Sequence, residues 1–451
     1  MHAYPAGHLF YRNLTRPFPE IVSGEGCWLT DADGKRYLDA VGGAFVASLG
    51  HGNAEIAEAV AAQARRIAYV NGTAFTTAAA EELAAEVAAT LPGDLDHLYF
   101  LSSGSEAVEA ALKLARQYWV ERGRPAKHRI IALTPAYHGN TLLALSASAR
   151  RHYQTLFGDW LVDVIRVPVP CFRCACGGTD ATCPTCTGTA LEAAILAAGA
   201  DTVAAFIAEP VGGSSTGAAV PRADYFRVVR EICDRHEVLF VADEVLCGAG
   251  RTGTWWAIEP FGVTPDLMTI GKGIAGGYTP LSGVAAPRRI VDVLAAGSGS
   301  LVHAQTFSFH PVACAAGLAV VRHLKAHRLV ERCGEQGRVF QSKLADLRSL
   351  PHVAAIRGRG LLAGVEFAED SPPRTGAPLP RALKFAETFT AQALAAGLVV
   401  WPNVGHADGT NGDLIMLAPP FIVSTQEIDE IVARFGTALE RTLSSLAVPV
   451  P

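Results

Sequence analysis

The sequence predicts an α/β fold with a large domain, built on a mixed and mainly parallel sheet, and a smaller α+β domain. From about residue 96, short apolar runs alternate with helical stretches, as in parallel strands joined by crossover helices. Each run is followed at once by polar or glycine-rich residues. After about residue 320 the pattern changes, which indicates a separate C-terminal unit.

The bulk properties of the chain exclude several classes of protein. The chain has 451 residues, of which 50% are hydrophobic, and a formal net charge of −5, so no basic stripe invites nucleic acid. No unbroken apolar run approaches the roughly 20 residues that span a bilayer. The first residues lack the basic and apolar regions of a secretory signal. We therefore expect a cytoplasmic protein that binds neither nucleic acid nor membrane.

The N-terminal part of the chain predicts a hairpin followed by helices. Residues 26–39 contain an Asp-Gly pair at Asp33, which is typical of a tight turn between two strands. Apolar residues recur at helical spacing in 54–69, and Thr77 is a typical cap for the next helix. We assign residues 1–60 to an N-terminal segment that contributes to the small domain.

Five apolar runs predict the parallel strands of the large domain, which we place at residues 61–325. The runs are HLYFL (97–101), RIIALT (129–134), TVAAFIA (202–208), VLFVA (238–242) and DLMTI (266–270). Because ligands of open α/β sheets bind at the carboxyl ends of the strands, the residues that follow these runs share one edge if the strands form one sheet. The polar residues expected at that edge are Ser103, Ser105, Tyr137, His138, Glu209, Asp243 and Lys272.

Residues 326–451 form the predicted small domain. Residues 357–367 and 414–423 have the apolar content of strands, whereas 381–396 and 425–445 have the spacing of helices. This order of strand, helix, strand and helix predicts an α+β unit that packs separately from the large sheet.

A glycine-rich segment, GAGRTG at 248–253, matches the dinucleotide fingerprint G-x-G-x-x-G. A true dinucleotide motif comes after a strand and opens a helix, whereas TWWAIEPFGVTPD comes next here and is a poor helix start. We interpret the segment as a glycine-rich loop of the active site. A nicotinamide-dependent oxidoreductase remains the alternative from a different class of enzyme.

The segment SSGSEAVEAALKLARQYW, 102–119, predicts a helix whose first turn could bind a phosphate. Ser103 is a suitable cap, Gly104 lets a ligand approach the backbone, and Ser105 adds a hydroxyl to the free N–H groups. The segment is not a Walker loop, because no G-K-[ST] is present after its glycine. Taken alone, the segment is better interpreted as a plain helix cap.

Lys272 and Asp243 lie at the ends of two successive predicted strands. A lysine at a buried strand end is costly unless it has a role, and burial beside another cation would lower its pKa and make it a nucleophile toward an aldehyde. Asp243 would hold the proton of a pyridinium ring. Together with the phosphate cradle, these groups fit pyridoxal phosphate (PLP). The alternative is a buried Asp–Lys ion pair, which would not need Tyr137 or the glycines around Lys272.

With these motifs in place, the sequence resembles the class-III aminotransferases, PLP-dependent enzymes of fold type I that include the omega-transaminases. The resemblance runs from YLDAVGGAFVASLGHGNAEI (37–56) to LAPPFIV (417–423) and rests on SSGSEAVEAALKLAR, YHGNT, AEPV, ADEV, GRTG, PDLMTIGKGIAGGYTPLSG and TFSFHPVACAAG. It implies a homodimer that transfers an amino group from an amine or amino acid to a keto acid or aldehyde by a ping-pong mechanism. An aminomutase, racemase or decarboxylase on the same fold remains the alternative.

The resemblance implies a role for each matching residue. Lys272 would form the Schiff base and shuttle a proton, Asp243 would keep the pyridine nitrogen protonated, and Tyr137 would stack on the ring. Val245 would pack on the other face of the ring, and Thr306 would reach the phosphate across the subunit interface. The remaining cofactor-binding residues are Ser103, Gly104, Ser105, His138 and Glu209.

Two departures from the family pattern bear on the substrate. Leu246 stands where many relatives have a glutamine after DEV. Residues 401–417 contain no arginine, although many omega-transaminases carry one there that binds the carboxylate of the keto acid. This argues against specificity for glutamate or 2-oxoglutarate, or it moves carboxylate recognition to another arginine. Phe45 matches an aromatic wall of the substrate pocket, which suits a hydrophobic amine, and the resemblance makes pyruvate the expected acceptor.

Five of the ten cysteines lie in one insert, residues 168–190. Cys171-x2-Cys174 and Cys183-x2-Cys186, with glycines after each pair, have the spacing of zinc knuckles. Similar cysteine-bearing loops occur in a branch of the resembled family with no metal implied, so zinc stays an open alternative and no metal is assigned from the sequence. A disulfide fits a cytoplasmic chain less well.

Overall fold

The structure, a computed structural model, describes residues 1–174, 176, 182–369 and 376–446. The largest sheet in these ranges has seven strands in the order β4-β10-β9-β8-β7-β5-β6. Its strands are β4 (Leu95–Leu101), β5 (Arg129–Thr134), β6 (Ile165–Pro168), β7 (Val203–Ala208), β8 (Leu239–Asp243), β9 (Leu267–Ile270) and β10 (Ser282–Pro287). All five apolar runs predicted as strands belong to this sheet, so that prediction is confirmed.

Six of these seven strands run in the same direction. The pairs β5–β6, β5–β7, β7–β8 and β8–β9 are parallel. β10 is antiparallel to both β4 and β9, so β4 shares the direction of β9. The carboxyl ends of the five predicted strands therefore meet at one edge, and the predicted mixed, mainly parallel sheet is confirmed. The sequence analysis did not identify β6 or the antiparallel β10.

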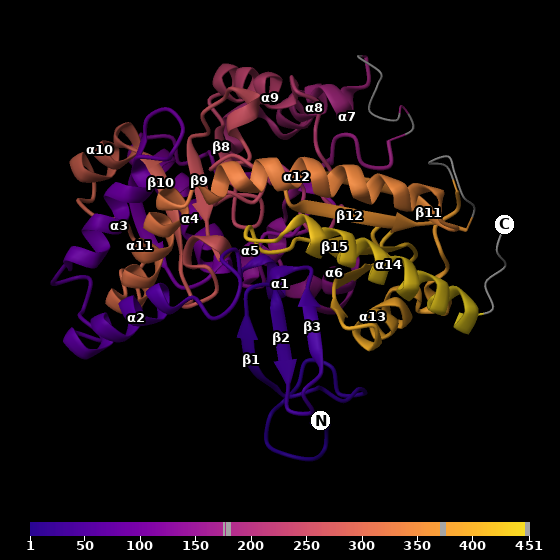
Figure 1. Ribbon diagram of the computed structural model, residues 1–451. Coiled ribbons are helices and arrows are strands. Elements are labelled where there is room, and N and C mark those ends of the chain that lie inside the picture. The colour runs from indigo at the N-terminus through magenta and orange to yellow at the C-terminus, as the bar shows by residue number, and fades with distance from the viewer. Residues whose placement is uncertain (175, 177–181, 370–375, 447–451) are drawn as a thin grey trace.

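Helices cover both faces of the large sheet (Figure 1). In β7, Phe206 packs into one hydrophobic cluster and Ile207 into another on the opposite face, because successive side chains of a strand alternate. Burial on both sides explains why the strand sequences are continuous apolar runs. The helices of this part are α3 (Ala78–Ala88), α4 (Gly104–Glu121), α5 (Leu142–Ala147), α6 (Arg151–Phe157), α7 (Pro184–Thr187), α8 (Thr189–Ala198), α9 (Tyr225–Arg235), α10 (Arg288–Ala296) and α11 (Pro311–Ala326).

The N-terminal strands form a second sheet with a short strand from far along the chain. The order is β1 (Ile21–Glu25), β2 (Trp28–Asp31), β3 (Arg36–Asp39) and β13 (Leu398–Val399). β2 and β3 form the predicted hairpin, and β3 pairs in parallel with β13. After the short helix α1 (Gly42–Phe45), helix α2 (Ala54–Arg66) instead packs against α11. The domain limits at 60 and 325 stay predictions.

The third sheet lies in the C-terminal part, in the order β11 (Val353–Arg359), β12 (Leu362–Phe367), β15 (Asp413–Leu417) and β14 (Trp401–Val404). The prediction of one strand over 357–367 was wrong, because the chain reverses at Gly360 and forms the β11–β12 hairpin. A side chain at Gly360 would lie 2.5 Å from the backbone carbon of Thr252, so the turn is pressed against the glycine loop.

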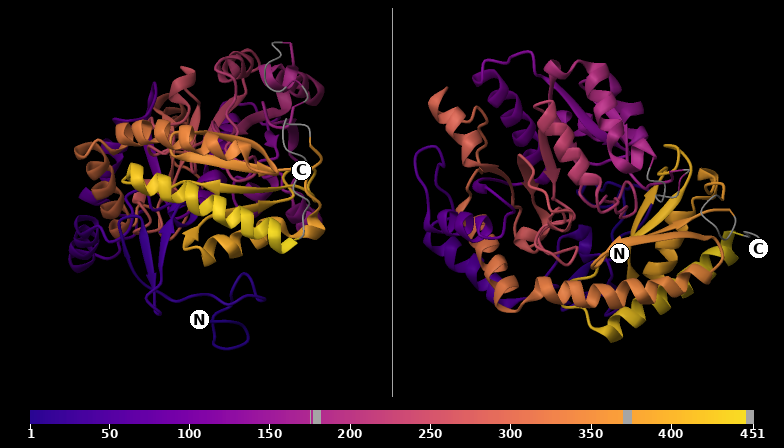
Figure 2. Two further views of the ribbon diagram at one scale, coloured as in Figure 1. Left: turned by 45° about the vertical axis from the view of Figure 1, so that its right-hand side comes forward. Right: turned by 90° about the horizontal axis from the view of Figure 1, so that it is seen from above.

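Three helices cover this C-terminal sheet: α12 (Leu329–Ala345), α13 (Phe385–Ala395) and α14 (Thr425–Leu446). α12 and α14 pack side by side (Figure 2). Val320 and Leu324 of α11 belong to the same hydrophobic core as Leu329 and Phe340 of α12, so this core ties the two parts of the chain together. In the described ranges, no helix is both long and apolar enough to cross a membrane.

Candidate active site

The carboxyl-end edge of the large sheet brings the predicted site residues together. We call this set the site edge, and it consists of Ser103–Ser105, Tyr137, His138, Glu209, Asp243, Val245 and Lys272. Glu209 lies within electrostatic range of His138, Asp243 and Lys272. Lys272 likewise interacts with Asp243 and Glu209. Residues at the carboxyl ends of five different strands thus converge on one small region.

Asp243 ends β8 and is held by three neighbours. His138 Nδ1 lies 2.6 Å from Asp243 Oδ2, and both side chains are almost fully buried. Thr269 Oγ1 donates to Asp243 Oδ1 at 2.9 Å, and the backbone N–H of Val245 donates to the same oxygen at 3.1 Å. These three contacts fix the direction of the carboxylate. The sequence analysis missed Thr269, which the alternation of β9 places beside Asp243 in the neighbouring strand.

Lys272 begins a short 3₁₀ helix, η4 (Lys272–Ala275), immediately after β9. Its φ of 46° lies in the left-handed region, which is uncommon for a residue other than glycine and is found where the surroundings impose it. Burial lowers the pKa of Lys272 below the ordinary value of a lysine, although Asp243 and Glu209 oppose the shift. A lower pKa increases the share of neutral amine, which is the nucleophilic form.

Glu209 comes directly after β7 and accepts a hydrogen bond from the backbone N–H of Gly213 at 2.9 Å. Burial raises the pKa of Glu209 to about 7. A carboxyl group with that pKa can take up or release a proton near neutral pH. Gly213 is required for this contact, since a Cβ there would lie 2.5 Å from Glu209 Oε1.

The start of α4 combines a complete cap with free donors. Ser103 Oγ accepts from the backbone N–H of Glu106 at 3.3 Å, and Glu106 Oε2 accepts from the N–H groups of Ser102 and Ser103 at 3.0 and 2.8 Å. Glu106 therefore occupies the donors outside the helix. The N–H groups of Gly104 and Ser105, in the first turn, lie outside the hydrogen-bond ladder of the helix and can receive an anion.

Gly104 and Ser105 also make contacts that the sequence did not reveal. A Cβ at Gly104 would lie 2.7 Å from Val245 Cγ1, so glycine allows α4 to approach the residue that comes after Asp243 and Glu244. Ser105 Oγ donates to Asn140 Oδ1 at 2.9 Å and accepts from the backbone N–H of Asn140 at 3.0 Å. In the sequence, the only signal that Asn140 belongs to the site is its position within the YHGNT motif.

Tyr137 lies beside an arginine that the sequence analysis did not identify. The guanidinium of Arg150 is 5.9 Å from the centroid of the Tyr137 ring, and the Tyr153 ring is 6.5 Å from it. Burial raises the pKa of Tyr137 and lowers the pKa of Arg150. Glu209 acts on Arg150 only at longer range, and within the described residues no carboxylate forms an ion pair with this guanidinium.

Phe45 is buried and has a φ of 65°. Its ring packs against that of Trp401, with the centroids 5.6 Å apart. Both residues belong to an apolar cluster that also includes Leu246 and Met416. Leu246, which stands where many relatives have a glutamine after DEV, is therefore part of the same apolar wall as Phe45.

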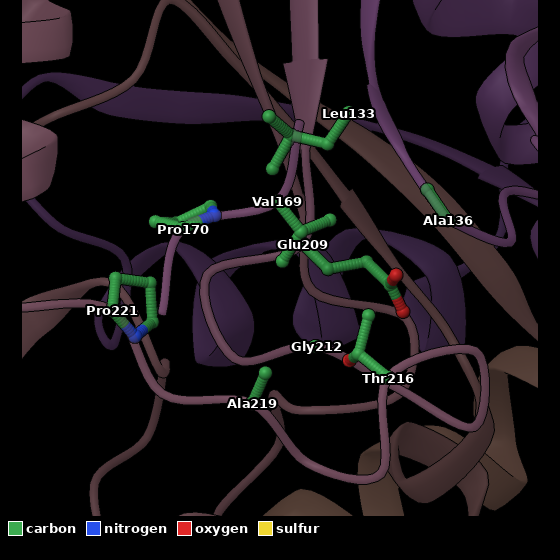
Figure 3. Close-up of a pocket in the computed structure, with 9 residues that line it drawn as sticks. All are labelled: Leu133, Ala136, Val169, Pro170, Glu209, Gly212, Thr216, Ala219 and Pro221. Atoms are coloured by element: carbon green, nitrogen blue, oxygen red, sulfur yellow. The ribbon is translucent and has the colours of Figure 1, made fainter. Parts of the chain in front are cut away.

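A small cavity lies behind Glu209. It has a volume of about 10 Å³ and is lined by Leu133, Ala136, Val169, Pro170, Glu209, Gly212, Thr216, Ala219 and Pro221 (Figure 3). Such a volume holds no more than about one water molecule, so it is not a substrate pocket. Its wall is informative, because Val169 and Pro170 belong to the cysteine insert.

Thr306 is exposed at the surface of the chain. Its backbone oxygen accepts from Tyr69 Oη at 3.0 Å, and the neighbouring Gln305 Nε2 donates to Ser102 Oγ at 3.3 Å. Large apolar side chains are exposed nearby in sequence, including Phe307 at 51% and Val302 at 73%. This surface adjoins the start of α4.

The glycine loop, residues 248–253, opens no helix and forms consecutive turns. Arg251 Nη1 donates to the backbone oxygens of Leu361 and Pro419 at 3.2 and 2.6 Å, and its guanidinium lies 4.6 Å from the Phe421 ring centroid. The loop therefore joins the large sheet to the C-terminal sheet. The alternative of a dinucleotide motif is wrong, because the motif needs a helix start at this point.

The cysteine insert gathers four thiols, but not the four expected from spacing. The clustered residues are Cys174, Cys176, Cys183 and Cys186, whose sulfur atoms all lie within 4.8 Å of one another. Cys176 takes the place that spacing suggests for Cys171, whose φ of 57° lies in the left-handed region. Part of the insert, residues 175 and 177–181, lies outside the described residues.

Comparisons with known proteins match nearly the whole chain to one family. Residues 11–439 match the family described as Aminotransferase class-III. An uncharacterized aminotransferase of Schizosaccharomyces pombe is 39% identical over 452 residues, which cover 98% of this chain and 96% of that protein.

Two solved structures share the fold over nearly their whole lengths. An (S)-enantioselective omega-transaminase from Thermomicrobium roseum is 34% identical, with a TM-score of 0.90 and 97% of each chain covered. A PLP-bound amine transaminase from an uncultivated Pseudomonas species is 32% identical, with a TM-score of 0.88 and 98% of each chain covered. Because the family match spans almost all of the sequence and these transaminases superpose on the same fold, the chain belongs to the class-III aminotransferases, enzymes that transfer amino groups with PLP.

Proposed function

We propose that the site edge binds PLP and transfers an amino group from an amine to a keto acid by a ping-pong mechanism. The observation that carries the proposal is the convergence of Lys272, Asp243 and the start of α4 on one edge. An amine of lowered pKa, an oriented carboxylate and two free backbone donors fit the aldehyde, ring nitrogen and phosphate of PLP in turn.

Each residue of the site edge would hold a different part of the cofactor. The N–H groups of Gly104 and Ser105 would bind the phosphate, and Ser103 and Ser105 would add hydroxyls, that of Ser105 in exchange for its bond to Asn140 Oδ1. Asp243, directed by His138 and Thr269, would hold a proton at the ring nitrogen. When bound, PLP supplies an electron sink that weakens the bonds at the substrate's amine-bearing carbon.

The chain's own residues would manage the protons of the reaction. Lys272 Nζ is neutral more readily than an ordinary lysine, because burial lowers its pKa, so it can accept and return a proton. Glu209 has a pKa of about 7 as a result of burial and can hold a proton close to Lys272. Tyr137 and Val245 would enclose the ring and exclude water from its two faces.

Arg150 would bind the carboxylate of the keto acid in place of the arginine that residues 401–417 lack. Three observations support this role: burial of the guanidinium, its position against Tyr137, and the absence of an ion pair to any described carboxylate. A buried guanidinium without a counter-charge is costly, and a bound carboxylate removes that cost. The apolar wall of Phe45 and Trp401 would accept the hydrophobic part of the amine.

The active unit would be a homodimer in which Thr306 completes the phosphate site of the partner subunit. Support comes from the exposed position of Thr306, the exposed Phe307 and Val302 around it, and the adjacent start of α4. Exposed apolar surface of this kind marks protein interfaces.

The reaction is tested by incubating the PLP-loaded protein with pyruvate and a panel of amines and by measuring alanine. We expect alanine formation and parallel lines in double-reciprocal plots of the two substrates. A protein that holds PLP but isomerises or decarboxylates the amine, with pyruvate unconsumed, would contradict the proposal.

Arg150 is tested separately with Arg150→Met. We expect the KM for pyruvate to rise about 10- to 100-fold, since hydrogen bonds to a charged group contribute roughly 1.5–3 kcal/mol. The half-reaction with an amine that lacks a carboxylate should change less than about twofold, because that substrate makes no contact with the guanidinium. The neighbouring Arg151→Met is the matched control, since Arg151 is exposed and bonds Asp408. Equal effects on both half-reactions would reject the assignment.

A further inference from the structure

The cysteine insert carries a cluster with the chemistry of a structural metal site. The closest sulfur pairs are Cys174–Cys176 at 3.2 Å, Cys174–Cys183 at 3.4 Å and Cys176–Cys186 at 3.4 Å. A disulfide requires its sulfur atoms to lie about 2.05 Å apart, so none of these pairs is a disulfide. All four sulfur atoms lie within 4.8 Å of one another, close enough for one ion to contact all four.

These distances suit a tetrahedral thiolate site. Zinc binds four cysteine sulfurs at about 2.3 Å, which places the sulfurs of a regular tetrahedron roughly 3.8 Å apart. The observed separations, from 3.2 Å to at most 4.8 Å, bracket that value. Soft thiolate ligands in a tetrahedral set favour zinc over the hard cations that oxygen ligands bind.

The surroundings of the cluster also fit a zinc site. The backbone N–H of Cys176 donates to the sulfur of Cys174, and the backbone N–H of Cys171 donates to the sulfur of Cys186. Such N–H donors spread the negative charge of coordinated thiolates. Arg222, which forms an ion pair with Asp224, lies within electrostatic range of Cys171 and Cys186.

We propose that Cys174, Cys176, Cys183 and Cys186 bind one structural Zn²⁺ ion. On binding, four thiols release four protons and form four sulfur–zinc bonds, with no change of oxidation state. The site has four protein ligands and no open position, so its role is structural rather than catalytic. The described part of the insert offers little else to fold around, since the helix α7 has only four residues.

The zinc site would fix a contact between the insert and the C-terminal sheet. Phe172 and Arg173 lie between Cys171 and Cys174 in the chain. Arg173 forms an ion pair with Glu366 of β12, and the Phe172 ring lies 5.3 Å from the guanidinium of Arg357. Arg357 in turn bonds the backbone oxygen of Thr216, in the loop after Glu209. Zinc therefore supports the wall behind Glu209 from outside the site edge.

Metal analysis of the wild-type holoenzyme tests the proposal first. The protein is purified without chelators or metal-affinity resin, and zinc is measured by mass spectrometry. We expect about one zinc ion per chain and, by X-ray absorption at the zinc edge, a shell of about four sulfurs near 2.3 Å. No stoichiometric zinc would overturn the proposal. So would a count of six reactive thiols in the denatured protein, since it would mean that four of the ten cysteines are oxidised to disulfides.

Two neighbouring variants then distinguish the observed ligand set from the set that spacing suggests. Cys176→Ser should lose most of the zinc, whereas Cys171→Ser, with its thiol outside the cluster, should keep it. Both variants should retain PLP, because neither thiol belongs to the site edge. Zinc retained in Cys176→Ser, or lost in Cys171→Ser, would overturn the assignment. If Cys176→Ser is insoluble, the wild-type measurements alone decide.

Discussion

The start of α4 and the glycine loop at 248–253 look alike in the sequence and differ in the structure. Both are glycine-rich, both come after a strand of the large sheet, and both match phosphate-binding patterns in part. At Ser103 the chain enters a helix of 18 residues with a capping box, and this helix leaves two N–H groups free. At Gly248 the chain enters turns, and Arg251 is bonded to the C-terminal sheet.

The residues after the glycines make the difference. A helix aligns its first N–H groups and its dipole toward one point, so a ligand can bind there. A series of turns uses the same glycines to bring chain segments close together. Two successive acids make the same contrast: Asp243 faces the site edge, whereas Glu244 accepts the backbone N–H groups of Ala257 and Ile258 at 2.9 and 2.7 Å.

The largest effect should come from Lys272→Ala. We expect turnover to fall by about 10⁴-fold or more, because the variant loses both a nucleophile and a proton carrier. Borohydride reduction and then peptide mapping should find a pyridoxyl group on Lys272 of the wild type and on no residue of the variant.

Lys127→Met is the matched control for this experiment, since Lys127 is another buried lysine. Its amino group bonds the backbone oxygens of Ala200, Val203 and His236. The control should lose about 1–3 kcal/mol of stability but keep the pyridoxyl label. A label on the Lys272→Ala variant would mean that another lysine holds the cofactor.

The acid pair sharpens the contrast further. Asp243→Asn should lower kcat by about 10²- to 10³-fold with little change in melting temperature, because it removes a charge that acts on the cofactor. Glu244→Gln should instead destabilise the fold by about 1–3 kcal/mol, since an amide cannot accept both backbone N–H groups. A loss of stability in Asp243→Asn together with a loss of kcat in Glu244→Gln would reverse the roles of the two acids.

The effect of Glu244 should depend on pH. Burial raises the pKa of Glu244 from 4.5 to about 7 in the folded protein. The folded state thus holds this proton more tightly than the unfolded state, so the contribution of Glu244 to stability is fully present below pH 4.5 and declines up to about pH 7. The loss of folding stability caused by Glu244→Gln, measured by denaturant unfolding, should therefore be larger at the acidic end of this range. A loss of stability that grows as pH rises would contradict the raised pKa of Glu244.

The two glycine segments can be compared directly by adding one methyl group to each. Gly104→Ala should weaken PLP binding about 10- to 100-fold, because its Cβ would lie 2.7 Å from Val245 Cγ1 and overpacking of this kind costs roughly 1–3 kcal/mol. Gly250 has a φ of 93°, and a Cβ there would lie 2.9 Å from Phe421. Gly250→Ala should therefore lower the melting temperature and leave PLP affinity unchanged. Equilibrium dialysis and thermal unfolding separate the two outcomes.

The smallest effect should come from Thr306→Ala, which we expect to weaken PLP binding about tenfold through the loss of one hydrogen bond to a charged group. Hybrid dimers with Lys272→Ala chains provide the control. Because Thr306 would act across the interface, a Lys272→Ala partner should restore affinity in the site of the Thr306→Ala chain. No recovery in the hybrid would place Thr306 in its own subunit's site or outside the site.

Several elements of the fold could be predicted from the sequence because their signals are local. The five predicted strands appear as apolar runs, of which β7, β8 and β9 are buried along their whole length, and Thr77 and Ser103 cap helices as predicted. β10 was missed because its sequence, SGVAAP, consists of small residues that carry no strong periodicity. The β11–β12 hairpin was missed because Gly360 stands in the run RGRGLL, which contains no Asn-Gly or Asp-Gly turn pair, and the close approach of Gly360 to Thr252 is visible only in the structure.

The sequence by itself determined the family, five parallel strands of the large sheet and the residues at their carboxyl ends, because each of these depends on a contiguous motif. Only the tertiary structure decided that Arg150 lies against Tyr137, that Thr269 supports Asp243, and that Cys176 rather than Cys171 joins the thiol cluster. These pairings join residues on different strands and loops. Their distances depend on packing and backbone direction, which spacing along the chain does not specify.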